Sequence, residues 1–274
     1  MVAFTGQEAF GAKLSLSIGG MLLQPSEFIK IVFVFFVASC FARSTGPGSV
    51  LFATVIAGAH VMLLVASRDL GGAGIYMVTY LIMLYVATGK IRYLGIGFLS
   101  GVGGLYVAYH LFGHVRTRVS AWMDPLSDID GAGYQVSHSL FAIGTGGWFG
   151  SGLYQGMPDR IPVVEKDFIF SAISEELGAV FALCLIFICM SCFLMFFNIS
   201  LQIRSRFYKL VALGLGTVYA TQTFLMLGGV IRFIPSTGVT LPLVSYGGSS
   251  LMSTMILFAI IQGMYLRRGD YKET

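Results

Sequence analysis

A carboxylate with cations on its N-terminal side stands where the chain enters a long apolar run. Asp167 directly precedes the run that begins at Phe168, and Lys166 and Arg160 lie shortly before it. Neighbouring cations keep a carboxylate ionised at neutral pH, so Asp167 is a candidate general base that takes a proton from an attacking hydroxyl. The alternative is structural, because aspartate is a favoured N-cap at the positive end of a helix. The two interpretations are compatible, since a cap also fixes the position of the carboxylate.

Five basic residues lie in or beside the polar segments of this part of the chain. They are Arg116, Arg118, Arg160, Lys166 and Arg232. Arginine matches phosphate oxygens with two parallel hydrogen bonds, so these side chains are candidates for binding an anionic lipid headgroup. The alternative is that they only anchor the protein at the membrane interface. A cationic cavity at bilayer level, with one fixed carboxylate, suits a lipid-linked phosphate substrate.

Two further acids follow inside the apolar run. At about 100° per residue, Ser171, Ser174 and Glu175 fall near the helical face of Asp167, whereas Glu176 points nearly the opposite way. Carboxylates at this depth are costly and normally face a bundle interior or water. Glu175 is therefore a candidate for lining the same cavity. For Glu176 we expect a bond to another helix or to a backbone donor.

Two polar, glycine-rich stretches are expected to frame that cavity. Residues 113–167 are too long for a simple connection, and their aromatics, turn glycines and charges of both signs predict a folded cap or re-entrant element. The second stretch, 235–250, contains Ser245 and Tyr246, which we take as candidate substrate contacts. Polar backbone at membrane depth is tolerated only where it is buried in protein or lines a wet cavity. We therefore expect the two stretches to share one cavity.

The elements that position these residues must be membrane-spanning helices. Hydrophobic residues make up 56% of the 274 residues and charged residues only 11%, against about 25% charged in soluble domains. This composition excludes a soluble enzyme, a disordered chain and a nucleic-acid binder. The cysteines Cys189 and Cys192 form a CxxC pattern, which we interpret as two small apolar residues in a buried helix. The histidines are scattered, so no metal ligand is assigned.

Seven apolar runs predict an all-α integral membrane protein, a polytopic bundle of seven transmembrane helices in one domain over 1–274. The runs are 25–43, 49–66, 70–88, 93–112, 168–199, 210–231 and 245–266, each near the roughly 20 residues that span a bilayer. Basic residues in the short connections place the C-terminus in the cytoplasm and the large loop 113–167 outside. Met1 then lies outside without a signal peptide, so either a short tail is translocated unaided or upstream helices are missing.

Several motifs in order carry a resemblance to a known family. They include Gln24-Pro25-Ser26-Glu27, Asp69-Leu70-Gly71, Gly133-Tyr134-Gln135, Asp167-Phe168-Ile169-Phe170, Glu175-Glu176-Leu177-Gly178 and the run from Pro235 to Ser250. Each motif is weak alone. Together, over nearly the whole chain, they resemble the RodA/FtsW/SpoVE (SEDS) family.

The resemblance implies a ten-helix protein that polymerises lipid II into glycan strands at the outer face of the bacterial cytoplasmic membrane, in division, elongation or sporulation. It also implies a class B penicillin-binding protein as partner and Asp167 as the essential catalytic residue. The seven runs would then be helices four to ten, with three upstream helices absent from this chain. At four places the chain departs from the family pattern, with Leu14 for a tryptophan, His138 for a glutamine, Met226 for an asparagine, and Val163-Val164-Glu165-Lys166 for Glu-x-His-Thr.

The expected reaction is a glycosyl transfer. The 4-hydroxyl of the acceptor's GlcNAc attacks the anomeric carbon of the lipid-linked chain, Asp167 takes the proton, and undecaprenyl pyrophosphate leaves. Arg118, Arg160, Lys166 or Arg232 would neutralise the pyrophosphate, and a divalent cation could assist. The alternatives are a lipid II flippase, which needs a polar route to the cytoplasmic side, a seven-helix receptor, and an inactive shortened family member.

Overall fold

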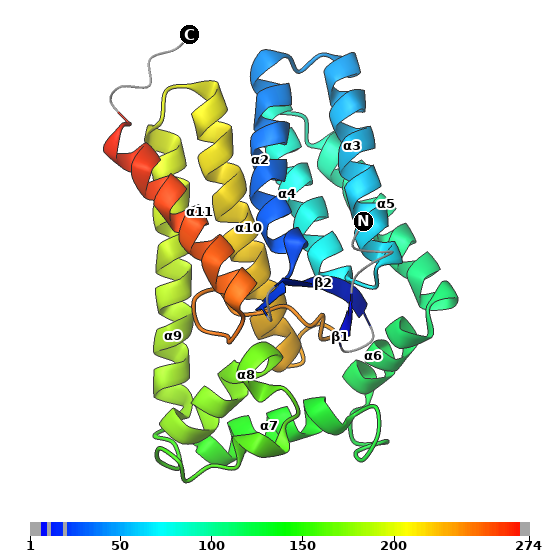
Figure 1. Cartoon of the computed structure of the whole chain (residues 1–274), viewed down its shortest axis with the longest axis vertical. Coiled ribbons are helices and arrows are strands. Elements are labelled where there is room, and N and C mark those ends of the chain that lie inside the picture. Colours follow the sequence, from blue (N-terminus) through cyan, green and yellow to red (C-terminus); the bar gives the residue numbers. More distant parts are fainter. Residues whose placement is uncertain (1–6, 10–11, 19–20, 269–274) are drawn as a thin grey trace. The chain divides into compact units, whose positions relative to one another are not determined.

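The computed structural model describes residues 7–9, 12–18 and 21–268. Seven helices in this part of the chain are long and apolar enough to cross a membrane, which confirms the seven predicted runs. They are α2 (Pro25–Arg43), α3 (Pro47–Ala66), α4 (Leu70–Thr88), α5 (Arg92–Leu111), α9 (Ile169–Gln202), α10 (Arg206–Val230) and α11 (Gly248–Leu266) (Figure 1). The fold is that of an all-α, multi-pass membrane protein.

A short antiparallel meander, which the sequence patterns do not predict, precedes α2. It consists of β1 (Gln7–Ala9), β2 (Ala12–Ile18) and β3 (Met21–Leu23), in the order β1-β2-β3. Leu16 pairs with Leu23 and Ile18 with Met21 across β2 and β3. Leu14, which stands where the family pattern has a tryptophan, lies in β2. At the other end of the chain, Asp270, Lys272 and Glu273 of the predicted cytoplasmic tail lie outside the described residues.

The chain divides into two compact units. Unit 1 comprises the described parts of residues 1–98, 192–221 and 247–274, and unit 2 comprises residues 99–191 and 222–246. The single membrane domain expected from the sequence stays a prediction. All eight candidate site residues belong to unit 2.

In unit 1, α2 packs against α3, α4 and α11. A partly buried ion pair near the start of α2 joins Lys30 Nζ to Glu27 Oε2 at 2.6 Å, and Ser253 Oγ donates to the same carboxylate oxygen at 3.1 Å. Pairing is what makes charges tolerable inside an apolar span. At the start of α4, Asp69 Oδ1 accepts the N–H of Gly72 at 2.7 Å, so Asp69 is the N-cap of that helix.

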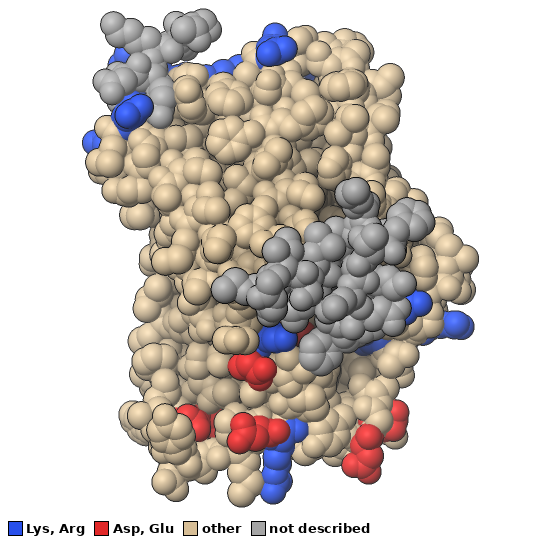
Figure 2. Space-filling view, in the orientation of Figure 1, with Lys and Arg blue, Asp and Glu red and all other residues tan. Residues whose placement is uncertain are grey.

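In unit 2, the long loop is folded, as its composition predicted. It contains α6 (Gly113–Met123), α7 (Tyr134–Gly146), a 3-10 turn η1 (Pro158–Arg160) and the short α8 (Val164–Asp167), and Figure 1 shows α7 running across the lower end of α9. Figure 2 shows acidic side chains gathered in the lower part of the same view. The loop is therefore a structured cap and not a flexible connection.

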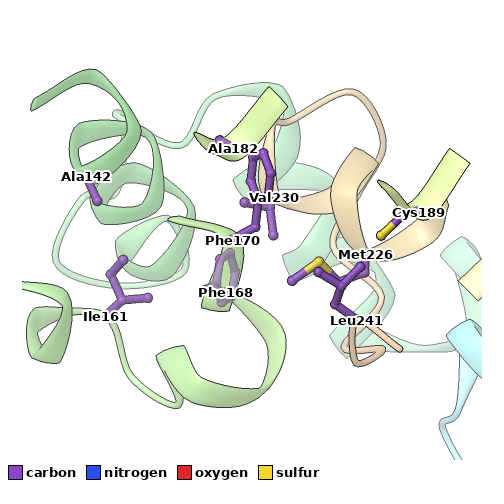
Figure 3. Close-up of a cluster of buried hydrophobic side chains, with 9 residues drawn as sticks. All are labelled: Ala142, Ile161, Phe168, Phe170, Ala182, Cys189, Met226, Val230 and Leu241. Carbon is purple, nitrogen blue, oxygen red and sulfur yellow. The ribbon is translucent and has the colours of Figure 1, made fainter. Parts of the chain in front are cut away.

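Apolar side chains from α7, the loop that leads to α9, α9 itself, α10 and the segment after α10 form the core of unit 2 (Figure 3). The cluster comprises Ala142, Ile161, Phe168, Phe170, Ala182, Cys189, Met226, Val230 and Leu241. Phe168 and Phe170 are 2% and 4% exposed, and burying each such ring contributes roughly 1.5–3 kcal/mol. These two residues flank the start of α9 and fix the backbone next to Asp167. Cys189 is one of the buried apolar residues, in keeping with its interpretation as a packing residue.

The long helix α9 is broken at Gly178, where the sequence predicted a continuous span. Gly178 has φ 84° and ψ 173°, a conformation that glycine adopts and side-chain-bearing residues avoid. The loop after α7 occupies the break. Its carbonyls at Gly147 and Trp148 accept the N–H groups of Ala179 and Val180 at 2.9 and 3.2 Å. On the other side of the break, the N–H groups of Ser151 and Gly152 donate to the carbonyls of residues 175 and 176, so the backbone groups freed by the break are paired.

Candidate active site

Asp167 is the last residue of α8, and α9 begins two residues later. The structural alternative from the sequence, an N-cap of the spanning helix, is therefore wrong. The residue at the junction is Phe168, whose carbonyl accepts the N–H of Ser171 at 2.8 Å. Because the buried Phe168 ring holds this junction, packing fixes the backbone next to Asp167.

Arg118, from α6, is the arginine that acts on Asp167. The two side chains approach the same backbone position, because a methyl group on Gly238 would lie 3.4 Å from Asp167 Oδ2 and 3.6 Å from Arg118 Nη2. Gly238 itself has φ 72°, which favours glycine. Arg118 also donates from Nη1 to the carbonyl of Ser236 at 3.3 Å. The guanidinium thus joins the large loop to the segment 235–246, as expected for one shared site.

The pKa of Asp167 fits proton transfer near neutral pH. Burial raises the pKa of the Asp167 carboxyl from 3.8 to about 6, while the charges of Arg118 and Lys166 lower it and that of Glu165 raises it. The sequence predicts that Lys166 and Arg160 keep the group ionised, whereas in the structure the cations that lower its pKa are Arg118 and Lys166. A base is most effective when its pKa lies near the working pH.

Ser245 and Tyr246 hold the segment 235–246 against α8. Ser245 Oγ donates to the carbonyl of Lys166 at 2.6 Å and accepts the N–H of Leu241 at 2.8 Å. The N–H of Tyr246 donates to the carbonyl of Glu165 at 2.8 Å, and its phenol ring is 71% exposed. The Ser245 hydroxyl is therefore occupied by backbone groups, whereas the Tyr246 ring is open to solvent or ligand.

Arg232 clamps the end of the helix that carries Arg118. Its Nε and Nη2 donate to the carbonyls of Trp122 and Met123 at 2.8 and 2.7 Å, and the indole N–H of Trp122 returns a bond to the Arg232 carbonyl at 3.1 Å. A cation at these terminal carbonyls complements the helix dipole. Arg160, by contrast, is exposed on η1. Of the four cations expected to neutralise the pyrophosphate, Arg118 and Lys166 lie at Asp167.

Glu175 and Glu176 bind the loop after α7 and not Asp167. Glu175 is 8% exposed. Its Oε1 accepts the N–H of Met157 at 3.1 Å, and its Oε2 has no hydrogen-bond partner among the described residues. Glu176 Oε1 accepts the N–H of Tyr154 at 3.2 Å, which confirms the expected backbone donor.

Two positioning contacts are not predicted from the sequence. Gln222 Nε2 donates to the carbonyl of Thr240 at 3.0 Å, and the hydroxyls of Ser139 and Ser171 lie 2.6 Å apart inside unit 2. Isolated polar residues in apolar runs were the available signal, since buried polar groups need partners. Met226, which replaces a family asparagine, lies beside Leu241 in the apolar cluster (Figure 3).

Comparisons with known proteins agree with this architecture. The family model described as cell cycle protein, covering FtsW, RodA and SpoVE, matches residues 1–268. The chain is 37% identical over 276 residues to peptidoglycan glycosyltransferase RodA of Mycobacterium tuberculosis (strain ATCC 25618 / H37Rv), covering 93% of this chain and 58% of that protein. It is 32% identical over 270 residues to the probable peptidoglycan glycosyltransferase FtsW of Aliivibrio salmonicida (strain LFI1238), covering 95% and 68%.

The fold also matches a solved structure. A chain from a study of the structural coordination of polymerization and crosslinking by a peptidoglycan synthase complex superposes with a TM-score of 0.81 at 24% identity, covering 97% of this chain and 77% of that one. The present chain spans a little over half the length of its mycobacterial RodA relatives. The family match, the two named relatives and the fold lead to one conclusion: the chain belongs to the FtsW/RodA/SpoVE family of cell cycle proteins.

Proposed function

We propose that this protein is a peptidoglycan glycosyltransferase that polymerises lipid II at the outer face of the cytoplasmic membrane. The observation that carries the proposal is the buried carboxylate of Asp167, with its pKa near 6, beside Arg118. The relatives named above are peptidoglycan glycosyltransferases by name, and that activity requires one base and a site for a pyrophosphate leaving group.

In the proposed reaction, the 4-hydroxyl of the acceptor GlcNAc forms a bond to the anomeric carbon of the lipid-linked glycan. Its proton passes to Asp167, and the bond to undecaprenyl pyrophosphate breaks. Arg118 and Lys166 neutralise the charge that develops on the leaving pyrophosphate, a contribution that is largest in the transition state. Single displacement at an α-linked donor gives a β-linked product. No group of three or more His, Cys, Asp or Glu side chains that could hold a metal ion stands together among the described residues.

The direct test is Asp167→Asn, which keeps the size of the side chain and removes its basicity. The variant binds lipid II and makes no glycan polymer on a gel. The matched control is Asp159→Asn, an exposed acid in the same loop, which polymerises as the unchanged protein does. Polymer at an unchanged rate from the Asp167 variant refutes the role of the base. Transfer of labelled lipid II across vesicle membranes by the unchanged protein, without polymer, would support the flippase alternative instead.

The proposal extends to topology and partner. The basic residues Arg204, Arg206 and Lys209 follow α9, and the positive-inside rule places them and the C-terminus in the cytoplasm. Fluorescent-protein and phosphatase fusions at the C-terminus distinguish the two sides. The structural relative comes from a peptidoglycan synthase complex, and we propose a class B penicillin-binding protein as the partner, to be tested by co-purification from membranes.

A further inference from the structure

The loop between α7 and η1 exposes an unusual set of large apolar side chains. Trp148, Phe149, Leu153, Tyr154 and Met157 are 69%, 87%, 62%, 93% and 59% exposed, and we call them the apolar loop surface. An isolated exposed apolar residue needs no explanation, whereas several within one short segment indicate contact with another apolar phase. The segment is ordered by bonds to α9, so its exposure is not the consequence of a loose loop.

The position of this loop along α9 is fixed by hydrogen bonds. The carbonyl of Trp148 accepts the N–H of Val180 at 3.2 Å, and the carboxylates of Glu175 and Glu176 hold the N–H groups of Met157 and Tyr154. Gly146, Gly150 and Gly178 make this close approach possible, because a side chain at any of them would collide with backbone atoms. The apolar loop surface therefore stands level with the break in α9.

The length of α9 gives the depth of that break in a bilayer. From Ala179 to Gln202, where the basic residues of the inner surface follow, the helix has about 24 residues and a length of about 36 Å. The hydrocarbon core is about 30 Å thick. The break at Gly178 thus lies at the outer edge of the hydrocarbon, the level that tryptophan and tyrosine prefer.

The neighbouring part of α9 continues the same apolar surface. Val180, Phe181 and Leu183 are 45%, 49% and 47% exposed just past the break, as expected of side chains that face lipid. The charged residues of the cap nearest in sequence, Asp159 and Arg160, follow the loop and are exposed. The charged part of the cap thus begins where the apolar loop surface ends.

We propose that the apolar loop surface is immersed in the headgroup–acyl boundary of the outer leaflet, so that a loop counted as extracytoplasmic is a membrane anchor of the cap. The partner of this surface is lipid. Through Glu175 and Glu176 the anchor sets the depth of the segment that leads to α8 and Asp167. Interfacial elements of this kind bury their apolar face about 5–10 Å into the boundary.

The chain carries a reporter for this proposal, because its two tryptophans are Trp122 and Trp148. The full chain is reconstituted in phosphatidylcholine–phosphatidylglycerol vesicles that contain lipids brominated either near the headgroup end or near the end of the acyl chain. In Trp122→Phe, where Trp148 is the sole tryptophan, we expect emission to lose most of its intensity with the shallow label, less with the deep label, and little with aqueous iodide. Subtracting the emission of Trp148→Phe from that of the unchanged protein gives the quenching of Trp148 in a protein that keeps Trp122.

A matched pair of charged substitutions tests the surface itself. In the single-tryptophan background, Phe149→Glu lifts the loop toward water and increases iodide quenching of Trp148 severalfold. Leu126→Glu, at an exposed apolar residue elsewhere in the cap, leaves both quenching patterns unchanged. Iodide quenching of Trp148 close to that of free tryptophan, with no effect of brominated lipid, overturns the proposal. Protection of Trp148 that appears only when a partner protein is added overturns it equally. Neither result depends on polymerase activity.

Discussion

Replacing the proposed catalytic acid should make the protein more stable while removing its activity. The ordinary pKa of an aspartate is 3.8, and burial raises that of Asp167 to about 6. Ionising this carboxyl therefore costs about 3 kcal/mol more in the folded protein than in the unfolded chain. Asp167→Asn, which carries no charge, avoids that cost. We expect its free energy of unfolding to exceed that of the unchanged protein by as much as about 3 kcal/mol above neutral pH.

The pH dependence of this gain has a definite sign. Between about pH 4 and pH 6 the folded protein retains a proton on Asp167 that the unfolded chain has released, so the stability of the unchanged protein falls as pH rises. The advantage of Asp167→Asn is accordingly complete above about pH 7, about half as large near pH 5, and absent below about pH 4.

Denaturant unfolding in detergent at several pH values measures the difference, with Asp159→Asn as the control, because its carboxylate is exposed. An Asp167→Asn protein that is less stable than the unchanged protein above neutral pH would show that the carboxylate is a structural anion. The reasoning from desolvation would then be refuted.

The remaining predictions concern the groups around this acid. Initial rates of polymerisation should rise as pH passes about 6, and Arg118→Gln should move this midpoint to higher pH, since it removes a cation that lowers the pKa of the base; an unmoved midpoint contradicts the assignment. Arg232→Gln should cost roughly 1–3 kcal/mol of stability, because it removes two charge-assisted hydrogen bonds to the terminal carbonyls of α6, whereas Arg160→Gln should leave unfolding unchanged. Ser245→Ala should destabilise the protein by a similar roughly 1–3 kcal/mol through the loss of two backbone bonds. Val163→Gly should stabilise it by about 1 kcal/mol, because a β-branched residue at φ 58° is strained. Chemical unfolding of the four variants checks these expectations.

The spans were predictable because their signal is local. A run of about 20 apolar residues reports a helix wherever it occurs, and all seven runs are helices in the structure. The break in α9 was not predicted, because Gly178 interrupts no apolar pattern and the backbone groups that fill the break come from residues 147–152. A hydropathy pattern depends only on neighbouring residues, so it cannot predict a bonding partner about thirty positions away in the chain.

In the candidate site, too, features with a local signal were predictable and contacts between distant segments were not. Asp167 was identified from its residue type, its position before an apolar run and its family motif, all of which lie in a few consecutive residues. Arg160 was preferred as its cationic neighbour because it is close in sequence, whereas the structure brings Arg118 from another helix. The sequence suggests Ser245 as a substrate contact, and in the structure its hydroxyl bonds to two backbone groups. Proximity in sequence is a poor guide where helices bring distant segments together.

The way the site is held explains how the chain accommodates its departures from the family pattern. Arg118, Arg232 and Ser245 all reach backbone carbonyls in positioning the elements around Asp167. A bond to a backbone group does not depend on the identity of the residue that provides it, so the neighbouring side chains are free to change. Met226 is one such change, because it packs into the apolar cluster where a polar side chain would need a partner.

Val163 is another change, and it brings a cost. Its left-handed backbone stands four residues before Asp167, so two unfavourable features, a strained residue and a desolvated carboxylate, occupy one short segment. Strain of this kind persists only where surrounding contacts over-determine the conformation. Here the buried Phe168 ring and the bonds from Ser245 and Tyr246 to α8 do so. A segment that is locally unfavourable but firmly held is what a preorganised base requires, because the cost of placing Asp167 is then met during folding and not during the reaction.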